Sequence, residues 1–156
     1  MRKIKPVLVL LITTIFVIVS SFPFASVVFA ATCSGSGCNG YFASSTGCGS
    51  SVTNVKTIYP TNARVDLRRS STCGTFWAKT TNTSSTAYYA NTTFWYQNNG
   101  TKYYTISSGG AIGLNQAVVT QQWYYSIANP PGLLACGKVA ASAISGPLGT
   151  PCTTTT

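Results

Sequence analysis

Acidic side chains and histidine are almost absent from this sequence. Among 156 residues there is no histidine, and Asp66 is the single carboxylate side chain. A serine or cysteine nucleophile needs a general base, most often histidine, and glycosidases need a pair of carboxylates. These familiar hydrolytic sites are excluded by composition, so the sequence predicts a protein that is not an enzyme. The remaining catalytic alternative is Asp66 acting as a general acid or base with Tyr, Lys or Arg partners.

A long hydrophobic run occurs only near the N-terminus. Three basic residues within the first five positions precede an apolar run of 13 residues, 7–19, and small residues end at Ala30. This is the pattern of a secretory signal peptide, so we expect residues 1–30 to be cleaved. A retained membrane anchor is the alternative, but the run is shorter than the roughly 20 residues that span a bilayer. The sequence thus predicts a secreted, extracellular protein with no stable membrane anchor after cleavage.

The rest of the chain is short and cationic. We expect residues 31–153 to form a single secreted β-domain, and the threonines at 154–156 to form a frayed tail. Three of the ten basic residues leave with the signal, so seven remain against Asp66, a net charge of about +6. The sequence specifies no oligomeric state.

All six cysteines follow the predicted cleavage point, which favours three disulfides in an exported chain. Zinc is the competing use, but without histidine it needs four cysteines, and no pair has the two-residue spacing of common zinc sites. We therefore expect no metal and no cofactor. The spacing of the cysteines does not determine how they pair. Cys136 with Cys152 is the preferred pair, because closing this loop would stabilise the fold by roughly 3 kcal/mol. The expected disulfide residues are Cys33, Cys38, Cys48, Cys73, Cys136 and Cys152.

Short β-branched and aromatic segments, separated by Gly, Pro, Asn and Ser, recur along the domain at about ten-residue spacing. This pattern predicts an all-β fold, a small disulfide-stabilised antiparallel β-sandwich or barrel. The Gly, Ser and Cys stretch at 31–51 has too few apolar residues for a core and must be ordered by disulfides. The expected strands are 52–59, 63–69, 75–80, 86–97, 101–107, 116–127 and 133–144.

Asn99-Gly100 is the clearest turn signal, because both residues tolerate the positive φ that a two-residue hairpin turn requires. Reflection about this turn sets Trp95 opposite Tyr104 and Tyr96 opposite Tyr103. Aromatic pairs of this kind stabilise neighbouring strands, so we expect a firm hairpin here.

A second hairpin is predicted for 65–80, where strand alternation separates two faces. One face carries the apolar residues Val65, Leu67, Phe76 and Ala78. The sequence also gathers four cations around Asp66, namely Arg64, Arg68, Arg69 and Lys79.

On the other face of this hairpin, Asp66 is expected near Lys79 and Arg68 near the ring of Trp77. The first pair would be an exposed ion pair and the second an exposed cation–π contact. We therefore interpret Asp66 as structural, with catalysis as the alternative.

The segments CSGSGCNGYFASSTGC and VDLRRSSTCGTFWAK, followed by LLACGK and a closing CT, resemble the YjfA family of small secreted bacterial proteins, a domain of unknown function. The resemblance spans about residues 33–153. It implies a secreted bacterial origin and the same cysteine frame, and it implies no activity. Besides the cysteines it depends on Leu67, Arg68, Ser70, Cys73, Trp77 and Ala78.

The abundance of aromatic side chains predicts a non-catalytic binding or cell-envelope-associated module. Exposed tyrosine and tryptophan suit sugar faces or protein partners, so we expect a cell-wall polymer or another protein as the ligand. The alternative is a cationic surface-active or antagonistic protein acting on anionic envelopes. Export argues against nucleic acid as the main partner. The predicted recognition surface comprises Arg68, Trp77, Trp95, Tyr96, Tyr103 and Tyr104.

Overall fold

A computed structural model describes residues 30–127, 130–149 and 151–154. The predicted signal segment lies outside these residues except for Ala30, and so do the last two threonines of the predicted tail. Nearly all regular structure is antiparallel β, as the sequence predicts, with two short 3-10 turns in the cysteine-rich segment. In chain order the elements are η1 (Gly35–Cys38), η2 (Cys48–Ser50), β1 (Val52–Ile58), β2 (Ala63–Ser70), β3 (Thr75–Asn82), β4 (Tyr88–Asn98), β5 (Thr101–Ile112), β6 (Ala117–Val119), β7 (Trp123–Tyr124) and β8 (Leu134–Ala140).

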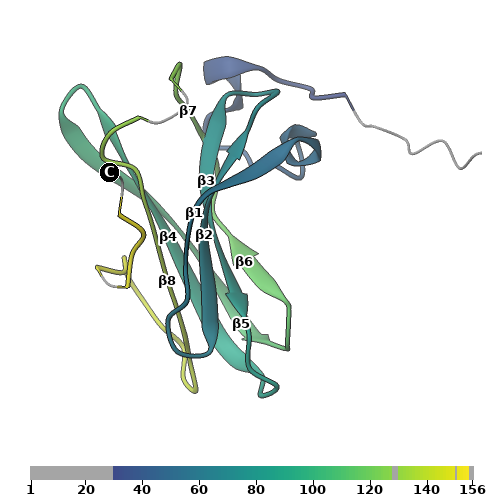
Figure 1. Ribbon diagram of the computed structural model, residues 1–156, viewed down its shortest axis with the longest axis vertical. Coiled ribbons are helices and arrows are strands. Elements are labelled where there is room, and N and C mark those ends of the chain that lie inside the picture. Colours follow the sequence, from purple (N-terminus) through teal and green to yellow (C-terminus); the bar gives the residue numbers. More distant parts are fainter. Residues whose placement is uncertain (1–29, 128–129, 150, 155–156) are drawn as a thin grey trace, which may run out of the picture.

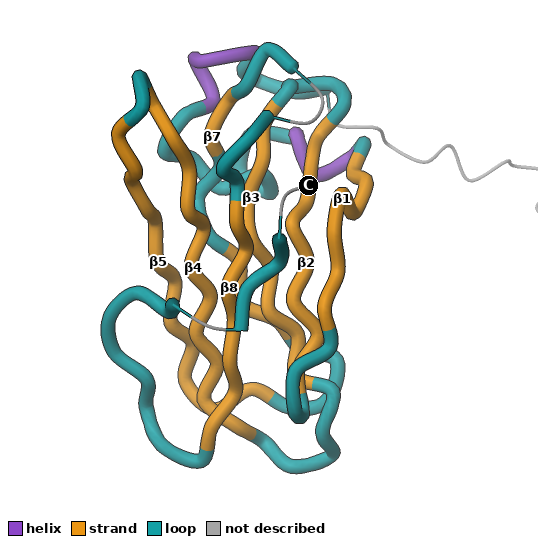
Figure 2. The backbone as a smooth tube through the Cα atoms, turned by 60° about the vertical axis from the view of Figure 1, so that its left-hand side comes forward, coloured by secondary structure: helices purple, strands orange, loops and turns teal. Residues whose placement is uncertain are grey.

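Two sheets face one another in these strands, so the fold is a sandwich (Figure 1). The first sheet has the order β1-β2-β3-β6, and β7 also pairs with β3. The second has the order β5-β4-β8. Figure 2 shows β5, β4 and β8 side by side, next to the layer that contains β3, β2 and β1.

The core lies between the sheets. Val65 and Leu67 from β2 and Phe76 and Ala78 from β3 belong to one buried cluster, as the alternation of the sequence predicts. The opposing sheet contributes Phe94, Tyr96 and Ala135, among others. The sheets approach closely at Gly137, where an added Cβ would lie 2.0 Å from Oγ1 of Thr80. Glycine permits this approach because it has no side chain.

The β4–β5 hairpin has the predicted register, with Trp95 opposite Tyr104 and Tyr96 opposite Tyr103. Asn99 and Gly100 both have positive φ, 50° and 78°. The two-residue turn therefore fixes this pairing.

The segment 116–127 is not the single strand that its composition predicts. It forms the separate short strands β6 and β7, both paired with β3. Between them, Oγ1 of Thr120 accepts the backbone N–H of Ala78, and the buried side chain of Gln122 accepts a hydrogen bond from Thr75 at 2.7 Å. Side-chain hydrogen bonds thus replace part of the backbone hydrogen bonding between this segment and β3.

Three disulfides fix the segments outside the strands: Cys33–Cys38, Cys48–Cys73 and Cys136–Cys152. The last is the pair that the sequence favours. It holds a C-terminal strap, residues 144–149 and 151–153, against the second sheet (Figure 2). Within this strap, the backbone carbonyl of Leu148 accepts a hydrogen bond from Nε1 of Trp95, and the N–H of Thr153 donates to the carbonyl of Ala135.

Candidate functional site

Asp66 lies on the outer face of the first sheet, in the middle of β2, and is only 2% exposed. Its Oδ1 accepts hydrogen bonds from Oγ1 of Thr57 at 2.6 Å and from Nε of Arg64 at 2.9 Å. The predicted pairing with Lys79 is correct in register, but the prediction of an exposed ion pair with Lys79 is wrong. The carboxylate is buried, and its ionic partner is Arg64 on its own strand.

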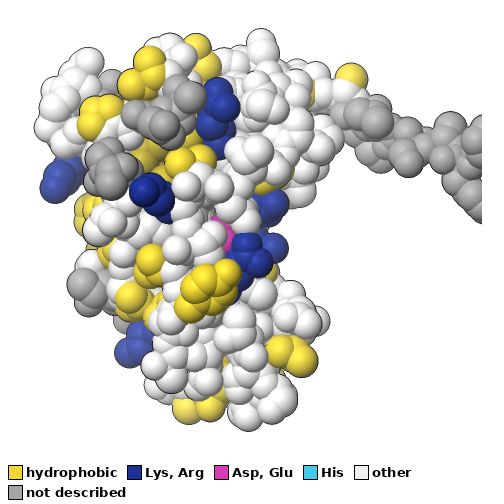
Figure 3. Space-filling view, in the orientation of Figure 1, with side chains coloured by type: hydrophobic (Ala, Val, Ile, Leu, Met, Phe, Trp, Pro, Cys, Tyr) yellow, Lys and Arg dark blue, Asp and Glu magenta, His cyan; other side chains and the backbone are white. Residues whose placement is uncertain are grey.

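Two further cations lie next to this carboxylate on the same face. Lys79 is directly opposite Asp66 on β3, and Arg68 is two residues along β2. Burial lowers the pKa of Lys79, and the nearby charge of Arg68 lowers it further. Burial also lowers the pKa of Arg68. We call Arg64, Arg68 and Lys79 the cationic face. In Figure 3, dark-blue Lys and Arg side chains lie beside the small magenta spot that is the only acidic surface in view.

Arg68 lies over Trp77 as predicted, with its Cζ 5.5 Å from the ring centroid. The prediction that this pair is exposed is wrong, because Trp77 is 2% exposed. The cysteine-rich segment packs against the ring through Cys38, Ala43 and Cys48. Arg68 therefore lies at the border between the part of the first sheet that the cysteine-rich segment covers and the part that it leaves open.

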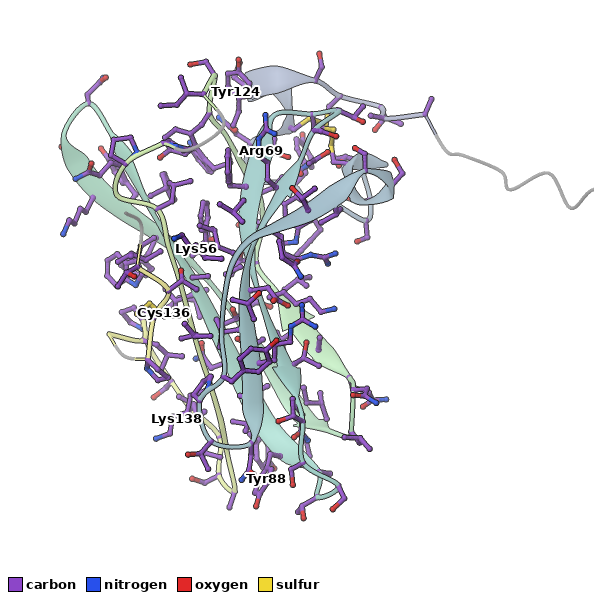
Figure 4. The ribbon with its side chains drawn as sticks, in the orientation of Figure 1. Lys56, Arg69, Tyr88, Tyr124, Cys136 and Lys138 are labelled. Carbon is purple, nitrogen blue, oxygen red and sulfur yellow. A yellow bond between two sulfur atoms is a disulfide. The ribbon has the colours of Figure 1, made fainter. Side chains whose placement is uncertain are left out.

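Arg69 does not belong to the cationic face, although the sequence places it next to Arg68. It pairs with Phe76, a core residue, so it points to the inner side of the sheet. Its Cζ is 5.8 Å from the Phe76 ring centroid. Figure 4 shows Arg69 near the same end of the molecule as Tyr124.

The four predicted aromatic residues of the β4–β5 hairpin fall on two different faces. Trp95 and Tyr104 contact each other on the outer face of the second sheet, with centroids 4.9 Å apart and rings tilted by 55°. Tyr103 stacks on the buried Tyr96 on the inner side. The residues of the predicted recognition surface therefore do not form one continuous surface of exposed rings.

The sequence did not single out Thr57, which contacts Asp66, or the exposed Tyr59. Thr57 lies opposite Asp66 in the β1–β2 register and binds its carboxylate. Tyr59 directly follows β1 and is 74% exposed. A signal was available for both residues, since predicted strand 52–59 places them on one face by alternation.

The sulfur atoms of Cys33, Cys38 and Cys48 lie within 4.8 Å of one another, the spacing of a candidate metal site. All three are oxidised, Cys33 with Cys38 and Cys48 with Cys73. Because metal ions bind the thiolate form of cysteine, this cluster does not offer a metal centre while the disulfides are intact.

A pocket lies within the cysteine-rich segment, apart from the cationic face. No charged side chain lines it, and its lining consists of hydroxyl-bearing residues, a glycine and one disulfide-bonded cysteine. Its lining residues are Thr32, Cys33, Gly37, Tyr41, Ser45 and Thr46.

No helix in the described residues is long and apolar enough to cross a membrane. No family model, curated protein or solved structure matches the chain. The resemblance to the YjfA family therefore stays a prediction.

Proposed function

We propose that this chain is a secreted, non-catalytic binding module that holds an anionic cell-wall polymer on its cationic face. The observation that carries this proposal is the charge balance around Asp66. Three cationic side chains, Arg64, Arg68 and Lys79, surround one carboxylate. Asp66 neutralises one of these positive charges, which leaves a net charge of two positive charges on this face.

The geometry favours a phosphate-bearing chain such as teichoic acid. Arg64 is engaged by Asp66, whereas Arg68 makes no ion pair among the described residues. Guanidinium groups bind phosphate oxygens through planar pairs of N–H donors. Lys79 adds a second positive group on the neighbouring strand. A repeating polyanion could contact both cations along an open strand face.

Stacking against neutral sugars is supported less well. Coplanar, exposed rings would suit sugar faces, but Trp95 and Tyr104 are tilted by 55°. Tyr103 lies on the other face of the same strand, since neighbouring residues of a strand point to opposite sides. Tyr59, exposed directly after β1, is a further ring that could contact the polymer.

Two charge-matched variants test the proposal. Arg68→Gln with Lys79→Gln removes two charges from the cationic face, whereas Lys102→Gln with Lys138→Gln removes two from the second sheet. Both lysines of the control are exposed, and Figure 4 shows Lys138 below Cys136, along β8. Binding to purified teichoic acid, peptidoglycan and chitin is measured for the oxidised proteins at two salt concentrations.

We expect retention on teichoic acid that weakens with salt, because screening reduces attraction between exposed charges. The cationic-face variant should lose affinity by about tenfold or more, since hydrogen bonds to charged groups contribute roughly 1.5–3 kcal/mol. The control should bind nearly as tightly as wild type. Equal losses in both variants would show diffuse attraction and contradict the proposed site. Leakage of anionic vesicles without polymer binding would favour the surface-active alternative.

A further inference from the structure

Three of the four sheet edges in this sandwich are protected. Exposed strand edges pair readily with other chains, and proteins block them with short strands, bulges, lysines or covering segments. The edge of β8 is covered by the strap, where the N–H of Gly137 donates to the carbonyl of Pro151. The Cys136–Cys152 disulfide fixes this contact covalently.

The first sheet is protected at both edges by other means. On one side, β1 has an irregular register between Asn54 and Lys56, and it carries the lysine within the strand. On the other side, the edge beyond β3 is formed by β6 and β7, which are three and two residues long. Neither edge presents a long regular ladder.

The edge of β5 is less protected than the other three: its pairing with β4 is irregular only beyond Ser108, and its one lysine lies next to the turn. This strand has 12 residues, the longest in the described structure. It pairs with β4, and no described strand pairs with its other edge. Its single charged residue is Lys102, next to the turn, while Tyr104 and Ile106 in its middle are 47% and 37% exposed.

We propose that β5 of a second copy of this chain pairs antiparallel with this edge, about a two-fold axis at Thr105. The regular part of β5 supports this register, because its pairing with β4 runs without a shift from Thr101 to Ser108. A pair centred on Thr105 sets Tyr104 opposite Ile106 twice, once on each side of the axis. Cross-strand pairs of aromatic and β-branched residues are favourable.

The same register separates the like charges and pairs the two Thr105 residues. Lys102 lies opposite Ser108 of the partner copy, so the two lysines do not face each other. The two Thr105 residues lie opposite each other at the axis, and threonine pairs across strands are favourable. The resulting dimer joins the two three-stranded sheets into one continuous sheet.

This pairing uses the second sheet and leaves the cationic face of the first sheet open in both copies. A dimer could therefore contact one polymer chain twice, which raises avidity without any new contact. The pairing itself does not depend on the proposed function.

The mass of the oxidised protein is measured by sedimentation from micromolar to millimolar concentration, without a polymer. We expect wild type to approach the mass of two copies. Ile106→Lys should weaken dimerisation by about tenfold or more, because it replaces two apolar pairs with charges. Leu114→Lys is the matched control, since Leu114 is also exposed, at 52%, but lies beyond the end of β5.

Thr105→Cys tests the register. All six native cysteines are paired, so the introduced thiol is the only free one, and it should cross-link two copies on mild oxidation. Tyr103→Cys should not cross-link, because it would face Ser107 of the second copy. A wild-type protein that stays monomeric at millimolar concentration would overturn the proposal. Equal weakening by Leu114→Lys, or a dimer that Thr105→Cys cannot cross-link, would do the same.

Discussion

Arg64 and Asp66 lie two residues apart on the same face of β2, and Nε of Arg64 is 2.9 Å from Oδ1 of Asp66. The carboxylate is therefore paired along its own strand and not across to Lys79. This arrangement orients Arg64 and buries the negative charge, while the side chain of Arg64 stays 38% exposed. Lys79 and Arg68 are left as the cations that an external anion can reach.

Replacement of Asp66 should destabilise the fold without abolishing it. Asp66→Asn keeps the size of the side chain but leaves Arg64 without its counter-charge. We expect a loss of about 1–2 kcal/mol, less than for a fully buried ion pair, because Arg64 is partly in water. Urea unfolding measures this change. Thr53→Val, at an exposed position of β1, is the control and should have little effect. Unchanged stability of Asp66→Asn would mean that the pair contributes nothing.

A methyl group at Gly137 should disturb the contact between the sheets. The added Cβ would lie 2.0 Å from Oγ1 of Thr80 and 2.7 Å from Cγ2 of Val65. We expect Gly137→Ala to cost about 1–3 kcal/mol, the usual penalty for overpacking a core. Gly110→Ala is the matched control, because nothing lies within 4 Å of its added Cβ. Thermal unfolding should separate the two variants, and similar melting temperatures would argue against the close approach.

Loss of the Cys136–Cys152 disulfide should release the strap. The bond closes a sequence separation of 16 residues, so the paired Ala variant should lose about 3 kcal/mol. Release should also expose Trp95 to water, because its Nε1 donates to the carbonyl of Leu148 in the strap. Quenching by iodide reports this exposure when Trp95 is the only tryptophan, in a background with Trp77→Phe and Trp123→Phe. Removal of Cys33–Cys38, with a separation of five, should leave Trp95 unaffected. Unchanged quenching in the first variant would show that hydrogen bonds alone hold the strap.

Stability should rise with pH between neutrality and the normal pKa of lysine. The pKa of Lys79 is lowered by burial and by Arg68, so the folded state releases this proton at lower pH than the unfolded chain. In that window the unfolded state binds more protons, and the free energy of unfolding therefore increases with pH. Urea midpoints from pH 7 to pH 10, roughly up to the normal lysine pKa, measure the slope.

Lys79→Gln should flatten this rise, whereas Lys102→Gln, at an exposed position in β5, should preserve it. Tyrosine ionisation limits the experiment at high pH. Burial raises the pKa of Tyr96 and Tyr125, so stability should fall again once unfolded tyrosine ionises near pH 10. Identical slopes for wild type and Lys79→Gln would contradict the role given to Lys79.

The sequence predicted those parts of the fold that depend on local patterns. The turn at Asn99-Gly100 determines the register of its hairpin because a two-residue loop leaves one alignment. The faces of β2 and β3 follow from alternation, which correctly assigned Val65 and Leu67 to the core.

Burial of the outer face could not be predicted in the same way. Trp77 is covered by the cysteine-rich segment, which is distant in sequence. The Cys48–Cys73 disulfide joins this segment to the turn between β2 and β3. Asp66 is buried because Thr57 on β1 and Arg64 both approach its carboxylate. Alternation reports which face a residue is on, but not what lies over that face. The split of 116–127 has a similar origin, since it depends on Thr75 binding the side chain of Gln122.

The polar contacts under the cysteine-rich segment are formed by groups that do not titrate in ordinary media. Gln122 accepts from Thr75 and donates to Thr46, and all three residues are buried. Acid denaturation proceeds mainly through carboxylates that protonate and buried histidines that become charged. Here Asp66 is the only side chain of either kind. Acidic conditions should consequently leave most of the hydrogen bonds inside this sandwich unchanged.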